Sequence, residues 1–469
     1  MLAIRSRILH YTCTSPLQYE YLEDGVLLVE AGKVVDLQAA SSLAAAGFDL
    51  SRCEHLPDSL IIPGLIDTHI HSPQIDVIGS YGKQLLDWLN DYTFPAEAKL
   101  ADVEYAKSVA EEFIQQLLSN GTTTAMVFTT SHEHAAEAVF ESAYQRDMRL
   151  IAGKVLMDRN APENLMDTAA RGYQESTNLI ERWHGKGRLG YALTPRFSGT
   201  STDAQLRTVS QLHQQYPDTW IQTHLSENLA ELAWLRGICP EAKDYLDTYE
   251  RFGINNDRTI FAHGIHLSSD ELLRLADGGG RIAFCPTSNL FLGSGLLDLQ
   301  KLKDHGIPVS IASDVGGGTS FSLFRTLSEA YKVCQLQGYS LHPHEAMCLA
   351  TLGNAEALQL DNKIGNFAIN KEADFVILDP TATDLIKRRV TQTKTIADEL
   401  FVYITLGDER LVSRTYINGV LQYSQEPLAS GEPSAGGEPS ASGEPSAGGE
   451  PSANGEPSAS TEPSAKESN

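Results

Sequence analysis

The chain is 469 residues long and 42% apolar, which suits one large core or two moderate ones and excludes a disordered protein or a small disulfide scaffold. Lys and Arg number 36 against 61 for Asp and Glu, a formal net charge of −25. This charge opposes binding to nucleic acid and to anionic membrane surfaces, because both need Lys and Arg on their phosphates.

Strand-like runs occur near both ends of the chain. Residues 26–36 hold two β-rich runs around a glycine turn, and similar runs recur at 373–378 and 412–421. We interpret residues 1–61 together with 366–425 as one small β-sandwich domain built from both termini.

Between these ends, a β-branched run followed by a longer helical pattern is repeated eight times. The runs are residues 61–71, 122–130, 150–157, 189–197, 220–227, 259–267, 281–289 and 309–315. This alternation is typical of an α/β protein with a parallel sheet. It predicts a (β/α)8 TIM barrel over residues 62–365, with the catalytic groups where the strands end.

The composition changes at Glu426, and from Glu432 to Ala465 six copies of Glu-Pro-Ser-Ala recur every six residues in a background of Gly, Ser and Asn. Residues 426–469 hold eight acids and one lysine, a net charge of −7, which leaves −18 of the −25 for the rest. We predict a disordered acidic tail without chemistry, and a docking or spacing role stays open as the alternative.

The six cysteines, at positions 13, 53, 239, 285, 334 and 348, form no C-x-x-C pair, which is typical of reduced thiols. No apolar signal-peptide core follows the first residues, and nowhere do 18 apolar residues run together. We therefore expect a cytoplasmic protein that is neither exported by a signal peptide nor held in a membrane.

Polar residues gather at the ends of four predicted strands. The period-2 spacing of His69 and His71 places both on one face of a strand. The other runs contribute His224 with Glu227, then His263, and finally Asp314. Three imidazoles and a carboxylate suit zinc or Fe(II) and leave a coordination position for water. The pattern therefore predicts a metal site at the mouth of the barrel.

Such a metal lowers the pKa of bound water to about 7, which indicates hydrolysis. Glu227 lies three residues beyond His224, past the strand end, and is predicted to move protons. His263 either completes the metal shell or hydrogen-bonds the bound water and the developing oxyanion. Asp314 is expected to bind the metal and orient the hydroxide.

Several nearby features carry weaker signals. The second H-x-H pair, His132 and His134, is interpreted as part of a solvated loop, and His266 as loop structure. Residues 316–318 are all glycine, which favours close backbone packing over a phosphate cradle. The aromatic segment 86–94 suits a lid over the site and core packing equally.

The motifs at 63–71, 223–227, 261–264 and 313–314 resemble the metal-dependent deaminase branch of the amidohydrolase superfamily. Segments 69–74, 92–97, 153–158, 194–197, 285–289 and 314–318 are more narrowly similar to its guanine deaminase family. The resemblance spans the predicted barrel and leaves out the acidic tail.

By this resemblance, one zinc ion, with iron as the alternative, is bound by His69, His71, His224 and Asp314. The implied catalytic residues are Glu227, His263 and Asp314, and the implied substrate contacts are His71, Gln74, Arg196, Phe197, His224, Glu227 and Asp314. The resemblance further implies a homodimer that hydrolyses the free base guanine to xanthine and ammonia.

Elementary chemistry agrees with the implied substrate. The planar fork of Arg196 matches the adjacent O6 and N7 acceptors of guanine. Phe197 offers a stacking face, and Gln74 offers both a donor and an acceptor. The structural alternatives are a rim ion pair for Arg196 and core filling for Phe197.

Other functions remain as alternatives. A related deaminase would act on another purine, a pyrimidine or a triazine, and a remote alternative is a barrel scaffold that has lost its chemistry. Some members of the superfamily hold two metals bridged by a carboxylated lysine of the fourth strand. Here that strand ends in Arg196, and Lys154 falls in the third run, so we expect a single metal.

Overall fold

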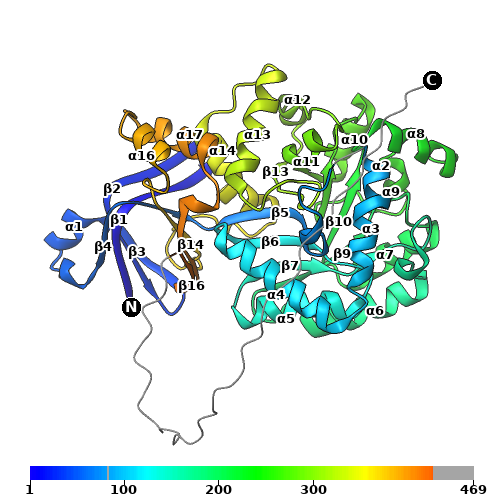
Figure 1. The fold of residues 1–469 in the computed structure, drawn as a ribbon, viewed down its shortest axis with the longest axis horizontal. Coiled ribbons are helices and arrows are strands. Elements are labelled where there is room, and N and C mark those ends of the chain that lie inside the picture. The colour runs from blue at the N-terminus through cyan, green and yellow to red at the C-terminus, as the bar shows by residue number, and fades with distance from the viewer. Residues whose placement is uncertain (82–83, 426–469) are drawn as a thin grey trace, which may run out of the picture. The chain divides into compact units, whose positions relative to one another are not determined.

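The computed structural model describes residues 1–81 and 84–425 (Figure 1). The predicted acidic tail, residues 426–469, therefore lies outside the described residues. None of the described helices has the length and the apolar character that crossing a membrane requires.

Eight parallel strands follow one another around a barrel in sequence order. They are β5 (Leu65–His71), β6 (Thr122–Phe128), β7 (Arg149–Gly153), β9 (Leu189–Pro195), β10 (Trp220–Leu225), β11 (Thr259–His263), β12 (Arg281–Phe284) and β13 (Val309–Ile311), with the short β8 (Val155–Leu156) beside β9. Backbone bonds from Asp314 N to His69 O and from His71 N to Val315 O, both 2.9 Å, connect the two ends of the series. The predicted (β/α)8 barrel is confirmed.

Helices lie around the outside of the barrel (Figure 1). The longer ones are α4 (Val103–Ser119), α5 (Glu133–Gln145), α6 (Ala169–Trp183), α7 (Asp203–Gln215), α8 (Leu229–Ile238), α10 (Ser269–Gly278) and α13 (Leu323–Leu336). Several begin at a capping side chain: Asp102 accepts from Tyr105 N, and Ser268 accepts from Glu271 N. These bonds satisfy N–H groups that a helix start leaves free.

The remaining helical segments, which are shorter apart from the 11-residue α17, complete the connections between strands and helices. They are α1 (Ala40–Ala45), α2 (Leu85–Trp88), α3 (Phe94–Lys99), α9 (Asp247–Glu250), α11 (Pro286–Phe291), α12 (Leu299–Asp304), α14 (Pro343–Cys348), α15 (Asn354–Ala357), α16 (Asp384–Val390), α17 (Ile396–Leu406), the 3-10 turns η1 (Leu50–Arg52), η2 (Ser72–Val77), η4 (Glu163–Leu165) and η6 (Glu409–Leu411), and the π-turns η3 (Leu89–Thr93) and η5 (Leu349–Gly353). The η2, α2, η3 and α3 segments follow the first barrel strand, and η2, α2 and η3 contribute side chains to the cavity described below.

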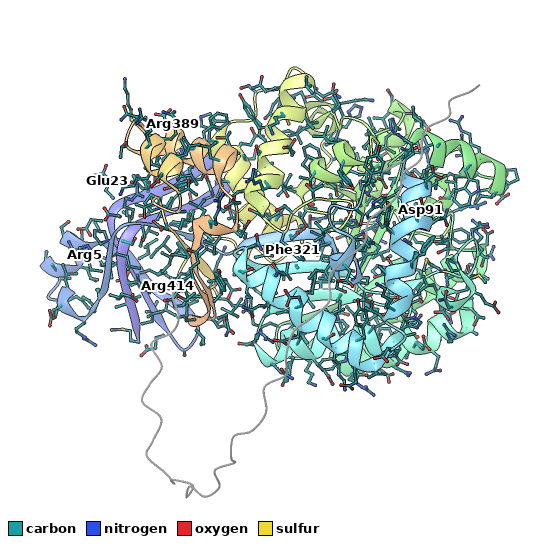
Figure 2. All side chains as sticks on the ribbon, in the orientation of Figure 1. Arg5, Glu23, Asp91, Phe321, Arg389 and Arg414 are labelled. Atoms are coloured by element: carbon teal, nitrogen blue, oxygen red, sulfur yellow. The ribbon has the colours of Figure 1, made fainter. Side chains whose placement is uncertain are left out.

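Strands from both ends of the chain form a second, mixed sheet in the order β16-β15-β14-β4-β1-β2-β3. They are β1 (Leu2–Thr14), β2 (Leu17–Glu30), β3 (Lys33–Ala39), β4 (Glu54–Pro63), β14 (Phe375–Leu378), β15 (Val412–Ile417) and β16 (Val420–Ser424). Figure 2 shows Arg5 and Arg414, one from each end of the chain, on these strands. In place of the two packed sheets of the predicted sandwich, the structure has one continuous sheet of seven strands, and apolar side chains from both ends of the chain share a buried cluster on it.

Gly64 marks the passage of the chain from the terminal sheet into the barrel. β4 ends at Pro63 and β5 begins at Leu65, so the apolar run 61–71 contains two strands of different sheets. A Cβ on Gly64 would lie 2.0 Å from Thr123 Oγ1, a separation at which atoms overlap. Glycine is therefore required where the two sheets approach. The domain boundaries after residues 61 and 365 stay a prediction.

Replacing Gly64 with Ala is expected to lower the free energy of unfolding by about 1–3 kcal/mol, because the added methyl group has to displace Thr123 in a packed region. Chemical denaturation measures this change. Gly237→Ala is the matched control: its Cβ would meet no atom within 4 Å, and alanine favours the helix, so stability should hold or rise by up to about 1 kcal/mol. Equal stability of the Gly64 variant and the wild type would contradict the close approach.

Candidate active site

Side chains from three barrel strands meet where these strands end. His69 and His71 come from β5, His224 comes from β10, and Asp314 follows β13. Asp314 Oδ1 lies 3.1 Å from His69 Nε2 and 3.2 Å from His71 Nε2. One ligand atom from each of the four residues lies within 4.8 Å of the others. The structure thus brings together the four residues that the resemblance assigns to the metal.

Their protonation states suit metal ligands. Burial lowers the pKa of His71 to about 3 and holds the pKa of His224 well below its usual value, so these imidazoles are neutral. Burial acts to raise the pKa of Asp314, but the neighbouring His69 and His71 outweigh burial and hold that pKa well below its usual value. The cluster therefore presents imidazole nitrogens and a charged carboxylate.

Hydrogen bonds fix the direction of these imidazoles. His224 Nδ1 lies 2.7 Å from the carbonyl oxygen of Arg196, which only accepts, so Nδ1 carries the proton and Nε2 presents a lone pair. The Nε2 atoms of His69 and His71 are 3.2 Å apart. Two imidazole nitrogens approach so closely where a proton or a cation lies between them. The donor set and its orientation therefore fit a divalent metal ion.

A second grouping in the same region contains a cysteine that the sequence did not single out as a ligand. Cys285, His69, His263 and Asp314 also have ligand atoms within 4.8 Å of one another. Burial raises the pKa of the Cys285 thiol well above its usual value, and Sγ donates to the Ala283 carbonyl oxygen at 3.4 Å. A protonated thiol is a poor metal ligand, so the histidine-rich grouping is the better site.

Glu227 lies beside the cluster without joining it. Its Oε2 is 3.4 Å from His263 Nε2, and its Oε1 accepts a hydrogen bond from Ser294 Oγ at 3.0 Å. Burial, together with the charge of Asp314, raises the pKa of Glu227 to about 8. The carboxyl group therefore holds a proton at neutral pH. Nothing in the sequence singled out Ser294, because this residue does not directly follow a predicted strand and belongs to none of the motifs.

His263 keeps both of the roles proposed for it. Its Nδ1 lies 2.8 Å from Asn289 Oδ1, which leaves the lone pair of Nε2 free, and its Nε2 is 3.7 Å from Asp314 Oδ2. Nε2 is buried without a hydrogen-bond partner among the described residues. An unpartnered buried nitrogen is costly, so a ligand or a water is expected to meet this atom.

The predicted substrate contacts line the same cavity as the cluster. Its walls include Gln74, Arg196 and Phe197, together with His71, His224, Glu227, His263 and Asp314. Arg196 is only 2% exposed, so it is not a rim residue. Phe197 also contacts Trp234, with ring centroids 5.9 Å apart, and thus packs in the core while facing the cavity.

Both interpretations of the aromatic segment 86–94 have support. Leu85, Trp88 and Leu89 line the cavity, as a cover would. Trp88 is also 2% exposed and belongs to an apolar cluster with Leu292. In Figure 2, Asp91 of this segment lies beside the barrel, far in the view from Arg5 on the terminal sheet. The segment therefore combines core packing with a wall of the site.

The remaining sequence features lie outside the cluster. His132 and His134 stack on each other at 5.7 Å at the start of α5. Lys154 is fully buried in ion pairs with Asp167 and Glu175, so it does not bridge two metals. His266 donates to the Ser294 carbonyl oxygen at 2.7 Å, as a loop anchor.

The glycines that follow Asp314 pack against backbone. A Cβ on Gly318 would lie 1.8 Å from the Ser313 carbonyl oxygen, and Gly316 N donates to Gln74 Oε1 at 3.1 Å. The bond to Gln74 occupies the backbone N–H of Gly316, which a phosphate-binding loop would need as a donor to the phosphate. Backbone packing, as expected from the sequence, accounts for these residues.

Comparison with known proteins gives the same picture. A model of the amidohydrolase family matches residues 60–421. The guanine deaminase of Escherichia coli (strain K12) is 49% identical over 405 residues, which cover 86% of this chain and 92% of that protein. The solved structure of E. coli guanine deaminase has a TM-score of 0.88 and 46% identity, covering 91% of this chain and 100% of that chain.

A second solved structure is guanine deaminase from C. acetobutylicum with bound guanine in the active site. It has a TM-score of 0.82 and 27% identity, and the match covers 90% of this chain and 100% of that chain. The barrel and its His/Asp cluster thus have the features of a metal-dependent hydrolase. The chain belongs to the amidohydrolase family and, within that family, to the guanine deaminases.

Proposed function

We propose that this protein hydrolyses guanine to xanthine and ammonia. The observation that carries the proposal is the lining of one cavity, which combines residues of the His/Asp cluster and Glu227 as a first group with Arg196, Gln74 and Phe197 as a second. A planar base held by the second group can present an exocyclic amine to the first. The relatives named guanine deaminase support the choice of substrate.

The metal is zinc, bound by His69, His71, His224 and Asp314, with Fe(II) as the alternative for the same donor set. When bound, a metal of this kind lowers the pKa of water from 15.7 to about 7 and so supplies hydroxide at neutral pH. The Asp314 carboxylate, besides binding, orients the nucleophile by accepting its proton in a hydrogen bond.

The remaining side chains move protons and hold charge. Glu227, protonated at neutral pH, gives a proton to a ring nitrogen of guanine and makes C2 more electrophilic. A hydroxyl group added at C2 would form a tetrahedral centre, and its O–H would donate a hydrogen bond to the Nε2 lone pair of His263. Glu227 then transfers a proton from this oxygen to the amine, the C2–N bond breaks, and ammonia leaves.

Recognition of the purine falls to the second group of residues in the cavity wall. The Arg196 guanidinium donates to the adjacent O6 and N7 acceptors, the Phe197 ring stacks on the base, and the Gln74 amide hydrogen-bonds the ring edge.

Replacing Arg196 with Lys is expected to raise KM for guanine about 10- to 100-fold, because an ammonium group does not offer two parallel donors. Steady-state kinetics with guanine measures the change, and an unaltered KM would contradict the assignment.

The class and the specificity are tested together. The purified protein is incubated separately with guanine, adenine and cytosine, and ammonia and the matching oxo product are measured. Reaction with guanine alone supports the proposal. Reaction with adenine or cytosine instead would favour a related deaminase, and no reaction by a metal-loaded protein would favour the scaffold.

We further propose that the protein works in the cytoplasm as a homodimer on a free base and binds neither nucleic acid nor membranes. The −18 charge outside the acidic tail and the reduced cysteines support this environment and these partners. The homodimer rests on the family resemblance, and light scattering measures it.

A further inference from the structure

The carboxylate of Glu97 contacts both polar side chains assigned to the purine. Glu97 belongs to α3 and is fully buried. Its Oε1 and Oε2 each lie 2.8 Å from Arg196 Nη1, and its Oε1 also accepts from Gln74 Nε2 at 3.2 Å. One carboxylate therefore fixes two side chains that are far apart in the sequence.

We propose that Glu97 is the positioning residue for purine recognition. The inference rests on the proposed function, and Glu97 acts through Arg196 and Gln74. It is absent from the side chains that line the cavity. Its contribution is to hold their donors in the orientation that a purine needs, before the purine arrives.

The geometry of the guanidinium explains how this works. Among the described residues, the hydrogen bonds of the Arg196 side chain all run through Nη1. Nε and Nη2 form the opposite edge of the fork, and their N–H bonds are parallel. With Glu97 on Nη1, this edge stays available for the two adjacent acceptors O6 and N7.

Two further contacts reduce the freedom of these side chains. The Phe94 ring, one helical turn before Glu97, lies 5.3 Å from Arg196 Cζ and supports the guanidinium from its face. The Gln74 amide donates to Glu97 through Nε2 and accepts from Gly316 N through Oε1 at 3.1 Å. The positions of the amide nitrogen and the amide oxygen are therefore both fixed, and so is the orientation in which the amide meets a ligand.

The ion pair also sets the charge of this side of the cavity. Arg196 is 2% exposed, so without Glu97 it would be a buried cation without a partner. Paired with Glu97, it offers hydrogen-bond donors with no net positive charge. A neutral base suits this arrangement better than a phosphorylated nucleotide does.

The test is Glu97→Gln, which keeps the shape and removes the charge. The Gln amide nitrogen would face the donors of Arg196 or Gln74, so one of these side chains should turn away. We expect KM for guanine to rise about 10- to 100-fold, with kcat changed less than about 5-fold and the metal content unchanged.

A selectivity measurement separates positioning from a structural role. 2-Aminopurine has the C2 amine and N7 of guanine and lacks O6, so its competitive inhibition constant should change less than about 5-fold in Glu97→Gln. A variant that is merely destabilised would lose active protein, which lowers the apparent kcat and leaves KM for guanine and the inhibition constant of 2-aminopurine unchanged. Glu97→Asp, which keeps the charge, should recover part of the lost affinity, and it carries the test if Glu97→Gln does not fold.

Glu399→Gln is the matched control, because Glu399 is a buried carboxylate paired with Arg7 at 2.7 Å, away from the cavity. It should alter stability and leave KM for guanine unchanged. An unchanged KM in Glu97→Gln, or equal losses for guanine and 2-aminopurine, would overturn the inference. If the wild type does not deaminate guanine, the proposed function is refuted. That outcome is distinct from a wild type that deaminates guanine and a Glu97→Gln variant with unchanged KM, which refutes only the role of Glu97.

Discussion

Replacing Glu227 with Gln is expected to lower kcat for guanine by about 10³- to 10⁴-fold while the metal content stays unchanged. The amide has nearly the same shape but cannot give or take a proton. Glu227 contacts His263 and Ser294 and lies outside the four-residue cluster, so the cluster should survive the change. Steady-state kinetics and metal analysis of the same preparation measure the two quantities.

Glu231→Gln is the control for this prediction, because Glu231 is a buried carboxyl group four residues further along. Burial raises its pKa to about 7, and its oxygens are engaged by Tyr245 OH at 2.6 Å and by Glu227 N at 3.1 Å. Its role is to cap α8, so kcat should fall less than about 10-fold. Wild-type turnover in Glu227→Gln, or equal losses in both variants, would refute proton transfer by Glu227.

Replacing Asp314 with Ala is expected to abolish both metal binding and turnover. Asp314 supplies the carboxylate of the cluster, and the three imidazoles that remain would hold a divalent cation less well without it. We expect the bound metal to fall below about a tenth of one ion per chain and kcat to fall by about 10⁴-fold or more. Metal analysis after gel filtration and ammonia release measure these losses.

The second H-x-H pair provides the control for the metal. His132→Ala removes an imidazole with the same local spacing that lies outside the cluster, so metal content and turnover should stay as in the wild type. Treatment of the wild type with a chelator should abolish turnover, and Zn²⁺ or Fe²⁺ added back shows which ion restores it. A full complement of metal in Asp314→Ala would contradict the assigned ligand set.

Much of the site was predictable because a parallel barrel gathers the carboxyl ends of its strands at one face. His69, His71, His224 and Asp314 each stand at or just beyond a strand end, so a count of strands sufficed to place them together. The assignment of Gln74, Arg196 and Phe197 to the substrate came from the family resemblance, and the structure places all three in the wall of the same cavity.

Other contacts had no sequence signal because they join residues on different segments. The bond between Ser294 and Glu227 spans 67 residues, and the ion pair between Glu97 and Arg196 spans 99. Neither partner's position predicts the other, since both depend on how loops pack over the barrel mouth. The same holds for Pro63 and Phe375, whose pairing joins strands from the two ends of the chain into one sheet.

By itself, the sequence determined the number and order of the barrel strands and the residue types at their ends, because strand periodicity and chain order are local properties. Tertiary structure alone decided that these groups line one cavity and which partner holds each of them. It also decided the protonation of Glu227, because burial and the charge of Asp314 raise that pKa only after residues distant in the chain have come together.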